Sequence, residues 1–340
     1  MSQNTEFKLL ELKIEVTNKC NLSCVHCSNN GSPSNNKSIS LQKCFDIIDE
    51  AYRMGVKKVA FSGGDPLIWP YINELINFSK DKEMISTIFT SGYVENAKER
   101  LLKLLDAGLA KTIFSLYSSE KSQHERITRK RGSYNITIEA IRYACEIGLD
   151  TELHFVAMSY NYNQLDRIVK LAQTLGVHTV SVLRFAPQGR GSLLPEGVLS
   201  KKQNLELRQN IFDLRNNNYT IRTGTPYNFL LVNENRQCSS GINKVTIDPN
   251  LRLYPCDGFK NIMAEEFVGT LNFSSLENES LANCWYNSPY LNSLRDYLTS
   301  DFDKPCDSCK SLKYCMSGCT AQKVLKHNKL IKCIDPDCLM

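Results

Sequence analysis

Short apolar runs alternate with longer amphipathic stretches from residue 8 to about residue 185. The apolar runs have the length and composition of strands, and the amphipathic stretches have apolar positions at helical spacing. Ser40 is the expected N-cap of the first helix. The predicted strands are LLELKIEV, KKVAFSGG, STIFTSG, KTIFSLYS, TELHFVAM and HTVSVLRFAP, and the predicted helices cover residues 41–54, 71–80, 95–106, 135–147 and 163–175.

Six successive β/α units predict parallel strands joined by right-handed crossovers. This number favours an α/β fold with a partial, TIM-like (β/α)6 barrel over an open doubly wound sheet. After Gly191 the rhythm changes, and a helix at about 200–216 is followed by hairpin-like strands in YTIR and NKVTIDPNLRLYPC and by a cysteine-rich tail. We therefore predict a barrel domain over residues 1–225 and a cysteine-rich domain over residues 226–340.

The 340-residue chain is 42% hydrophobic, which allows a large buried core. It has no apolar run of about 18 residues, and its first residues, MSQNTEFKLL, lack the segments of a signal peptide. We therefore expect a cytoplasmic protein with neither a membrane nor a nucleic acid as partner. The formal charge of +5 says little about partners, because every cysteine that binds metal as a thiolate lowers it.

Cysteine usage points to metal chemistry. Of the 14 cysteines, three lie within residues 20–27 and nine lie between residues 238 and 338. In a reducing compartment, clustered thiols are more often metal ligands than disulfides. The other two, Cys44 and Cys145, stand alone in predicted helices and are expected to be core residues.

The first three cysteines, Cys20, Cys24 and Cys27, directly follow the first predicted strand. A zinc site would need a fourth ligand such as His26, whose place between Cys24 and Cys27 disfavours joint tetrahedral coordination. A cubane iron–sulfur cluster is normally held by four thiolates, so three would leave one iron open to a chelating small molecule.

Three other predicted strands end in small polar or glycine-containing turns. These turns are Ser62-Gly63-Gly64-Asp65-Pro66, Thr90-Ser91-Gly92 and Ser115-Leu116-Tyr117-Ser118. In parallel α/β folds the ligand binds at the carboxyl ends of the strands. The turns and the cysteine trio are therefore expected on the same rim of the barrel.

The spacing of Cys20, Cys24 and Cys27, with the Gly63-Gly64-Asp65-Pro66 turn after the second strand, resembles the signature of the radical S-adenosylmethionine (SAM) enzymes. The resemblance implies that the trio holds a [4Fe–4S] cluster and that S-adenosylmethionine binds its open iron. It further implies reductive cleavage to a 5′-deoxyadenosyl radical, which abstracts hydrogen from the substrate. The protein would then place the reactants and exclude water.

The same resemblance implies a set of cofactor-binding residues. Gly63 and Gly64 would let bare backbone approach the methionine amino group, and Asp65 stands where the family often has glutamate. Arg184 suits the methionine carboxylate, and His26 occupies an often aromatic position near the adenine. The full set is Gly63, Gly64, Asp65, Pro66, Ser91, Ser115, Arg184 and His26.

The tail resembles the SPASM extension of this family, which binds two auxiliary iron–sulfur clusters. A zinc ribbon is the alternative reading of its short-spaced cysteine pairs. By the family pattern, the distal cluster would be held by Cys306, Cys309, Cys315 and Cys333, and the proximal cluster by Cys238, Cys256 and Cys319.

The tail departs from that pattern at the proximal cluster and at Leu251, and Cys338 has three alternative roles. The proximal cluster lacks a fourth ligand, which could be Cys284, Asp257 or none, in which case a substrate thiol could bind the iron. Leu251 stands where the family usually has glycine, so Pro249-Asn250 is expected to build the turn. Cys338 is a flexible bystander, a cluster ligand or a hydrogen-atom donor.

Members of the family with this extension mostly modify peptides and proteins. The resemblance therefore implies maturation of a ribosomally made peptide by crosslinking, epimerisation or oxidation, and the stretch 184–191 is similar to segments of peptide-maturing members. The alternatives are a radical dehydrogenase of a sugar or aminoglycoside, a sulfatase-maturating enzyme, and a non-catalytic iron–sulfur or zinc scaffold. An external flavodoxin or ferredoxin is expected as electron donor. Because the first strand begins near residue 8, leader recognition is expected from a separate protein or from a surface of this chain.

Overall fold

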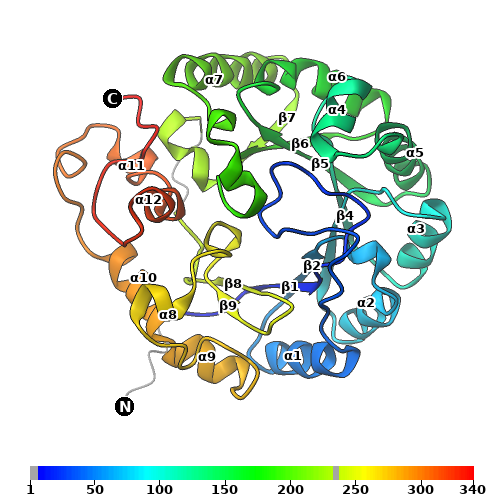
Figure 1. The fold of residues 1–340 in the computed structure, drawn as a ribbon, viewed down its shortest axis with the longest axis horizontal. Coiled ribbons are helices and arrows are strands. Elements are labelled where there is room, and N and C mark those ends of the chain that lie inside the picture. Colours follow the sequence, from blue (N-terminus) through cyan, green and yellow to red (C-terminus); the bar gives the residue numbers. More distant parts are fainter. Residues whose placement is uncertain (1–6, 233–236) are drawn as a thin grey trace.

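The fold is a partial barrel whose curved sheet carries helices on its outer side (Figure 1). The structure is a computed structural model and describes residues 7–232 and 237–340. Within these residues one sheet runs in the order β7-β6-β5-β4-β3-β2-β1-β8-β9. The strands are β1 Glu11–Thr17, β2 Lys58–Gly63, β3 Ile85–Thr90, β4 Lys111–Ser115, β5 Asp150–Ala157, β6 Thr179–Arg184, β7 Thr220–Thr223, β8 Lys244–Ile247 and β9 Leu253–Tyr254.

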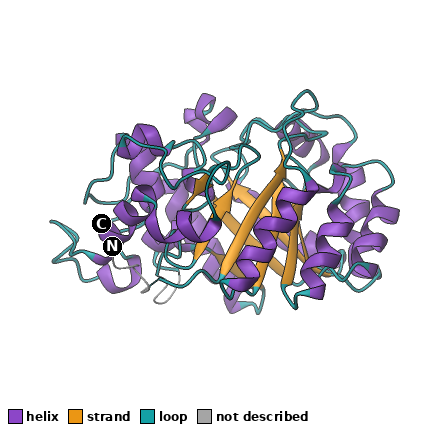
Figure 2. Ribbon diagram, turned by 90° about the horizontal axis from the view of Figure 1, so that it is seen from below, coloured by secondary structure: helices purple, strands orange, loops and turns teal. Residues whose placement is uncertain are grey.

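Figure 2 shows the strands side by side, with helices packed along them. No helix in the described ranges is long and apolar enough to cross a membrane. The helices are α1 Leu41–Arg53, α2 Ile72–Asp81, α3 Ala97–Asp106, α4 Lys121–Thr128, α5 Ser133–Glu146, α6 Leu165–Thr174, α7 Lys201–Asn216, α8 Ala264–Val268, α9 Leu281–Asn287, α10 Pro289–Thr299, α11 Leu312–Cys315 and α12 Thr320–His327.

The predicted α/β class and partial barrel are confirmed. Neighbouring strands from β1 to β7 all pair in parallel, and the Ser40 side chain caps α1 by accepting from the Lys43 N–H. Two details differ. The unit after β4 contains α4 as well as the predicted α5. The segment YTIR is not part of a hairpin. It contributes to β7, which follows α7 and pairs in parallel with β6.

The C-terminal region continues the same sheet. The predicted hairpin over 243–256 is confirmed as the antiparallel pair β8 and β9, and β8 also pairs in parallel with β1. Beyond it, a second apolar cluster includes Phe259 after β9, Tyr290 and Leu294 on α10 and Val324 on α12. The division at residue 225 stays a prediction.

The sequence of β1 explains how the barrel is built. Leu12, Ile14 and Val16 belong to the main apolar core that the outer helices complete. Because side chains alternate between the two faces of a strand, Lys13 and Glu15 face the barrel interior. The interior of this barrel is therefore polar near β1.

Candidate active site

The loop after β1 holds the cysteine trio against the carboxyl ends of the strands. Cys20 and Cys24 are buried, Cys27 is half-buried, and the Val25 N–H donates to the Ile127 carbonyl at 2.9 Å. The trio shares one apolar cluster with the first residues after three strands. These residues are Tyr117 after β4, Met158 after β5 and Phe185 after β6.

Burial keeps the Cys20 and Cys24 thiols protonated unless a cation is present. Desolvation raises the pKa of Cys20 to about 12 and the pKa of Cys24 well above its ordinary value, and neighbouring thiols raise both further. Three thiolates in this place need a multiply charged cation beside them, which a metal cluster supplies. The donor set therefore fits a cubane that keeps one iron free of protein ligands.

Gly63 and Gly64 let the turn after β2 pack directly against the chain that enters the cysteine loop. A Cβ on Gly63 would lie 2.0 Å from the Thr17 carbonyl oxygen, and one on Gly64 would lie 2.1 Å from the Lys19 carbonyl oxygen. A side chain at either position would push the two turns apart. The structure thus gives both glycines a close-packing role at the rim, and their contact with a cofactor stays a prediction.

The Asp65 carboxylate ties the ends of β2 and β3 together. It accepts from Thr90 Oγ1 (2.8 and 3.0 Å), from the Ser91 N–H (3.0 Å) and hydroxyl (2.6 Å), and from the Leu67 N–H (3.1 Å). Pro66 begins the short 3-10 helix that this carboxylate caps. Neighbouring groups, Ser91 among them, therefore fill the hydrogen-bonding capacity of the Asp65 carboxylate. We assign Asp65 and Ser91 to shaping the rim.

The loop after β6 closes over the cysteine loop. Arg190 Nε donates to the Cys24 carbonyl and the Arg190 N–H donates to the Cys27 carbonyl, both at 2.9 Å. Gly189 has φ +56°, and a Cβ there would lie 2.5 Å from the Ser28 carbonyl oxygen. These contacts fix the loop through its carbonyl groups and leave the thiols free to bind metal.

His26 is buried with its ring edge-on to Tyr117, at 4.4 Å between centroids. Desolvation lowers the pKa of His26 to about 4, so the ring is neutral at physiological pH. Its Nδ1 is buried without a hydrogen-bond partner among the described residues, and such atoms are rare in folded proteins. This orphaned nitrogen fits a bound ligand that supplies a partner. Ser115, at the end of β4, hydrogen-bonds through its side chain with Tyr117.

Arg184 has partners other than the predicted methionine carboxylate. Its guanidinium, on a side chain 5% exposed, donates to Asp335 (2.7 and 2.9 Å), to Asp337 (2.7 Å) and to the Pro226 carbonyl (3.0 Å). It also lies over the Phe229 ring, 4.4 Å from the centroid. These contacts engage both terminal nitrogens of the guanidinium, and its contact with the methionine carboxylate stays a prediction. We therefore assign Arg184 to holding the C-terminal tail.

The inward face of β1 carries a charged network that the sequence analysis did not single out. Asp257 Oδ1 lies 2.9 Å from Lys13 Nζ and 2.8 Å from Lys260 Nζ, and Lys260 also pairs with Glu15. Asn29, in the cysteine loop, donates to Glu15 at 2.8 Å. The network links the barrel interior, the cysteine loop and the C-terminal region. Alternation of charged and apolar residues along β1 is the sequence signal that could have revealed it.

The network continues across the barrel through an aromatic pair. Lys13 Nζ lies 4.2 Å from the centre of the Phe89 ring on β3, and Phe89 contacts His154 on β5 at 5.4 Å between centroids. His154 Nε2 lies 3.5 Å from Glu152, which pairs with Lys111 at 2.8 Å. The inner wall therefore offers charged and aromatic groups to a substrate.

The predicted proximal cysteines lie near one another. Cys256 and Cys319 pack against the same apolar cluster. Burial raises the pKa of Cys319 to about 12, and thiolates at Cys256 and Cys238 would raise it further. Cys284 is fully buried in the main core, and Asp257 Oδ1 is paired with two lysines. The fourth ligand of this set stays a prediction.

Leu251 adopts a backbone conformation that normally favours glycine. Its φ is +62°, in the left-handed region, at the position where the family usually has glycine. The Asp248 carboxylate holds the turn by accepting from the N–H groups of Asn250 and Arg252, both at 2.9 Å. The turn thus keeps the glycine geometry with a leucine, and Pro249-Asn250 alone does not build it.

Four C-terminal cysteines, Cys306, Cys309, Cys315 and Cys338, line one small cavity. The half-buried Cys333, predicted as the fourth member of the distal set, is not among its lining residues. The structure therefore brings together three of the predicted distal ligands and adds Cys338.

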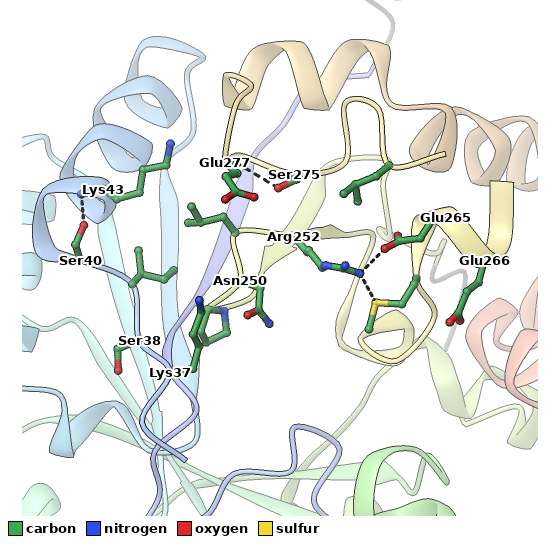
Figure 3. Close-up of a pocket in the computed structure, with 15 residues that line it drawn as sticks. Lys37, Ser38, Ser40, Lys43, Asn250, Arg252, Glu265, Glu266, Ser275 and Glu277 are labelled. Carbon is green, nitrogen blue, oxygen red and sulfur yellow. Dashed lines mark hydrogen bonds and ion pairs between the residues drawn. The ribbon is translucent and has the colours of Figure 1, made fainter. Parts of the chain in front are cut away.

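A groove of about 740 Å³ opens at the carboxyl ends of β1 and β8. Lys37 and Lys43 lie on the side of α1, Glu265 and Glu266 lie on the side of α8, and Arg252 lies between them (Figure 3). Arg252 pairs with Glu265 at 2.8 Å. Glu277 also lines the groove and lies between Lys43 and Arg252 (Figure 3), so the groove carries both charges and has two lysines near α1. It adjoins the segment that leaves the cysteine loop.

Residues 14–172 match the family model of the Radical SAM superfamily. The chain is 27% identical over 320 residues to the PqqA peptide cyclase of Granulibacter bethesdensis, covering 92% of this chain and 82% of the relative. It is 26% identical over 322 residues to the PqqA peptide cyclase of Bradyrhizobium diazoefficiens, with the same coverage.

Solved structures share the fold. Streptococcus suis SuiB bound to S-adenosylmethionine has a TM-score of 0.78 at 19% identity, covering 98% of this chain and 78% of that one. SuiB bound to the precursor peptide SuiA gives 0.77 at 19% identity, with coverage of 98% and 76%. Native anSMEcpe with bound AdoMet gives 0.75 at 14% identity, with coverage of 97% and 94%.

Proposed function

Residues 14–172 form a Radical SAM domain, and from this premise we propose that the protein modifies a ribosomally made peptide by radical chemistry, most directly by forming a crosslink. The observation that carries the proposal is the buried three-thiol loop, packed against Gly63 and Gly64 on the carboxyl rim of a partial barrel. The relatives named PqqA peptide cyclase support a peptide as substrate and a ring closure as outcome.

A Radical SAM domain binds S-adenosylmethionine and a [4Fe–4S] cluster, which together supply a 5′-deoxyadenosyl radical that abstracts a substrate hydrogen atom. Cys20, Cys24 and Cys27 would hold that cluster. The loop after β6 fixes the trio through the carbonyls of Cys24 and Cys27, and the apolar residues after β4, β5 and β6 exclude water from it.

The C-terminal cysteines support two auxiliary iron–sulfur clusters. Closing a ring removes two hydrogen atoms from the peptide, and the 5′-deoxyadenosyl radical would take one of them. The second would leave as a proton to solvent or a base and as an electron, and auxiliary clusters beside the barrel would give that electron a path away from the peptide. We place the proximal cluster at Cys238, Cys256 and Cys319, and an external flavodoxin or ferredoxin as the reductant for the first cluster.

The function is tested by incubating the reconstituted protein with S-adenosylmethionine, a reductant and the peptide encoded beside its gene, without oxygen. We expect one 5′-deoxyadenosine per turnover and a peptide lighter by two hydrogen atoms, with fragmentation suppressed between the linked residues. Peptide with S-adenosylmethionine but no protein is the control. An unchanged peptide, together with turnover of a sugar or another small molecule, would contradict the proposal.

The groove between α1 and α8 suits the part of the peptide that does not react. It opens on the rim that carries the cysteine loop, and its acidic and basic side chains fit a peptide segment that carries both charges. We place the leader segment of the substrate there, with its acidic residues toward Lys37 and Lys43.

Reversing the basic side of the groove should weaken peptide binding. We expect Lys37→Glu with Lys43→Glu to raise the Kd of a fluorescent precursor peptide about tenfold, which corresponds to about 1.4 kcal/mol. Lys201→Glu with Lys202→Glu, at the start of α7, makes the same charge change on an exposed surface and should leave Kd unchanged. If both double variants bind the peptide with the same Kd in anisotropy titrations, or if binding requires a second protein, then this groove does not recognise the leader.

A further inference from the structure

Residues 335–338 are held in place by buried polar contacts. Asp335, 2% exposed, accepts from the Arg184 guanidinium and from the Cys319 N–H at 2.8 Å. Asp337 pairs with the same guanidinium at 2.7 Å, and the Cys338 N–H donates to the Asp335 carbonyl at 3.0 Å. The turn that carries Cys338 is therefore anchored to the end of β6.

The anchored turn places Cys338 beside three cysteines from another part of the tail. Cys306, Cys309, Cys315 and Cys338 line one cavity, together with Ser317 and Asp335. Cys338 and Cys306 are both among the groups that raise the pKa of Cys315, to which burial contributes most. Four thiols around one cavity are the donor set of a cubane cluster.

Cys333 contacts Ser317 through its backbone. Its carbonyl accepts from the Ser317 hydroxyl at 3.1 Å, and that hydroxyl also accepts from Lys323 Nζ at 2.6 Å. The same hydroxyl contacts Cys306 Sγ at 3.3 Å. Cys333 itself is not among the residues that line the cavity.

We propose that Cys338, and not Cys333, is the fourth thiolate of the distal iron–sulfur cluster held by Cys306, Cys309 and Cys315. The proposal rests on the auxiliary clusters of the proposed function. It makes Arg184 and Asp335 positioning residues, because they fix the turn on which Cys338 lies. It also gives a reason for the contacts that the Arg184 guanidinium, at the end of β6, makes with the tail.

The test compares two single replacements in the full-length protein, reconstituted with iron and sulfide without oxygen. Cys338→Ala is expected to lose about four irons per chain, and Mössbauer and EPR spectra should lack one cluster. Cys333→Ala, the matched control 5 positions earlier in the same tail, should keep the full iron content. Retention of iron in Cys338→Ala, or loss of a cluster in Cys333→Ala, overturns the assignment.

Two further readouts separate this proposal from the proposed function and from misfolding. Cleavage of S-adenosylmethionine without peptide depends on the N-terminal trio, so its measurement in the unaltered protein tests the proposed function separately from the ligand assignment. In Cys338→Ser, an oxygen ligand can replace the thiolate, and the spectrum of the distal cluster alone should shift. No shift, with the iron content unchanged, overturns the assignment. If the unaltered protein carries auxiliary iron but does not cleave S-adenosylmethionine, the proposed function fails and the ligand assignment stands.

Discussion

Cys24→Ala is expected to abolish the formation of 5′-deoxyadenosine. Cys24 is one of three thiols that can hold the N-terminal cluster, and no other cysteine belongs to the apolar cluster that surrounds them. The variant should carry about four fewer irons per chain after reconstitution. Product formation is measured by chromatography after reduction with dithionite, and the iron content by a colorimetric assay.

Cys44→Ala is the matched control for this replacement. Cys44 is fully buried in α1 and belongs to the main core, so its removal creates a similar small void. We expect this variant to keep its iron and to cleave S-adenosylmethionine at the rate of the unaltered protein. Cleavage by Cys24→Ala at the same rate as Cys44→Ala would show that the trio does not hold the reactive cluster.

Gly64→Ala is expected to separate the turn after β2 from the cysteine loop. The new Cβ would lie 2.1 Å from the Lys19 carbonyl oxygen, and a backbone atom cannot rotate away as a side chain can. We expect a loss of stability of about 3 kcal/mol or more and a Kd for S-adenosylmethionine raised at least about tenfold. Thermal unfolding and equilibrium dialysis measure the two effects.

Gly148→Ala shows what a methyl group costs where space is open. Gly148 has φ +83°, and a Cβ added there would meet no atom within 4 Å, so only backbone strain of about 1 kcal/mol is expected. Binding of S-adenosylmethionine should not change. If Gly64→Ala binds the cofactor as well as Gly148→Ala does, the rim turn does not position the site.

The sequence predicted the elements of the barrel because their signals are local. Apolar periodicity identified β1 to β6 and their main helices, and Ser40 marked the start of α1. It missed α4, whose residues KSQHERIT are mostly polar and give a weak periodic signal. It also misread β7, because nothing in four residues distinguishes a parallel neighbour of β6 from a hairpin strand.

The site was predicted only in part, because only signals between residues close in the sequence could be recognised. Close spacing made the cysteine trio and the Gly63-Gly64 turn visible, whereas pairings between distant residues were not. Arg184 and Asp335 are 151 positions apart, and Lys13 and Asp257 are brought together only when β8 pairs with β1. Whether Cys333 or Cys338 faces the other tail cysteines likewise depends on tertiary contacts that spacing does not encode.

The most direct test of the account is the EPR spectrum of the reduced N-terminal cluster with and without S-adenosylmethionine. The measurement uses a variant in which Cys256, Cys306 and Cys309 are replaced by alanine, so that signals from the tail are removed. The account predicts a spectrum of one [4Fe–4S] cluster whose g values shift when S-adenosylmethionine is added. Zinc in place of iron at Cys20, Cys24 and Cys27, or a spectrum that S-adenosylmethionine leaves unchanged, would contradict it.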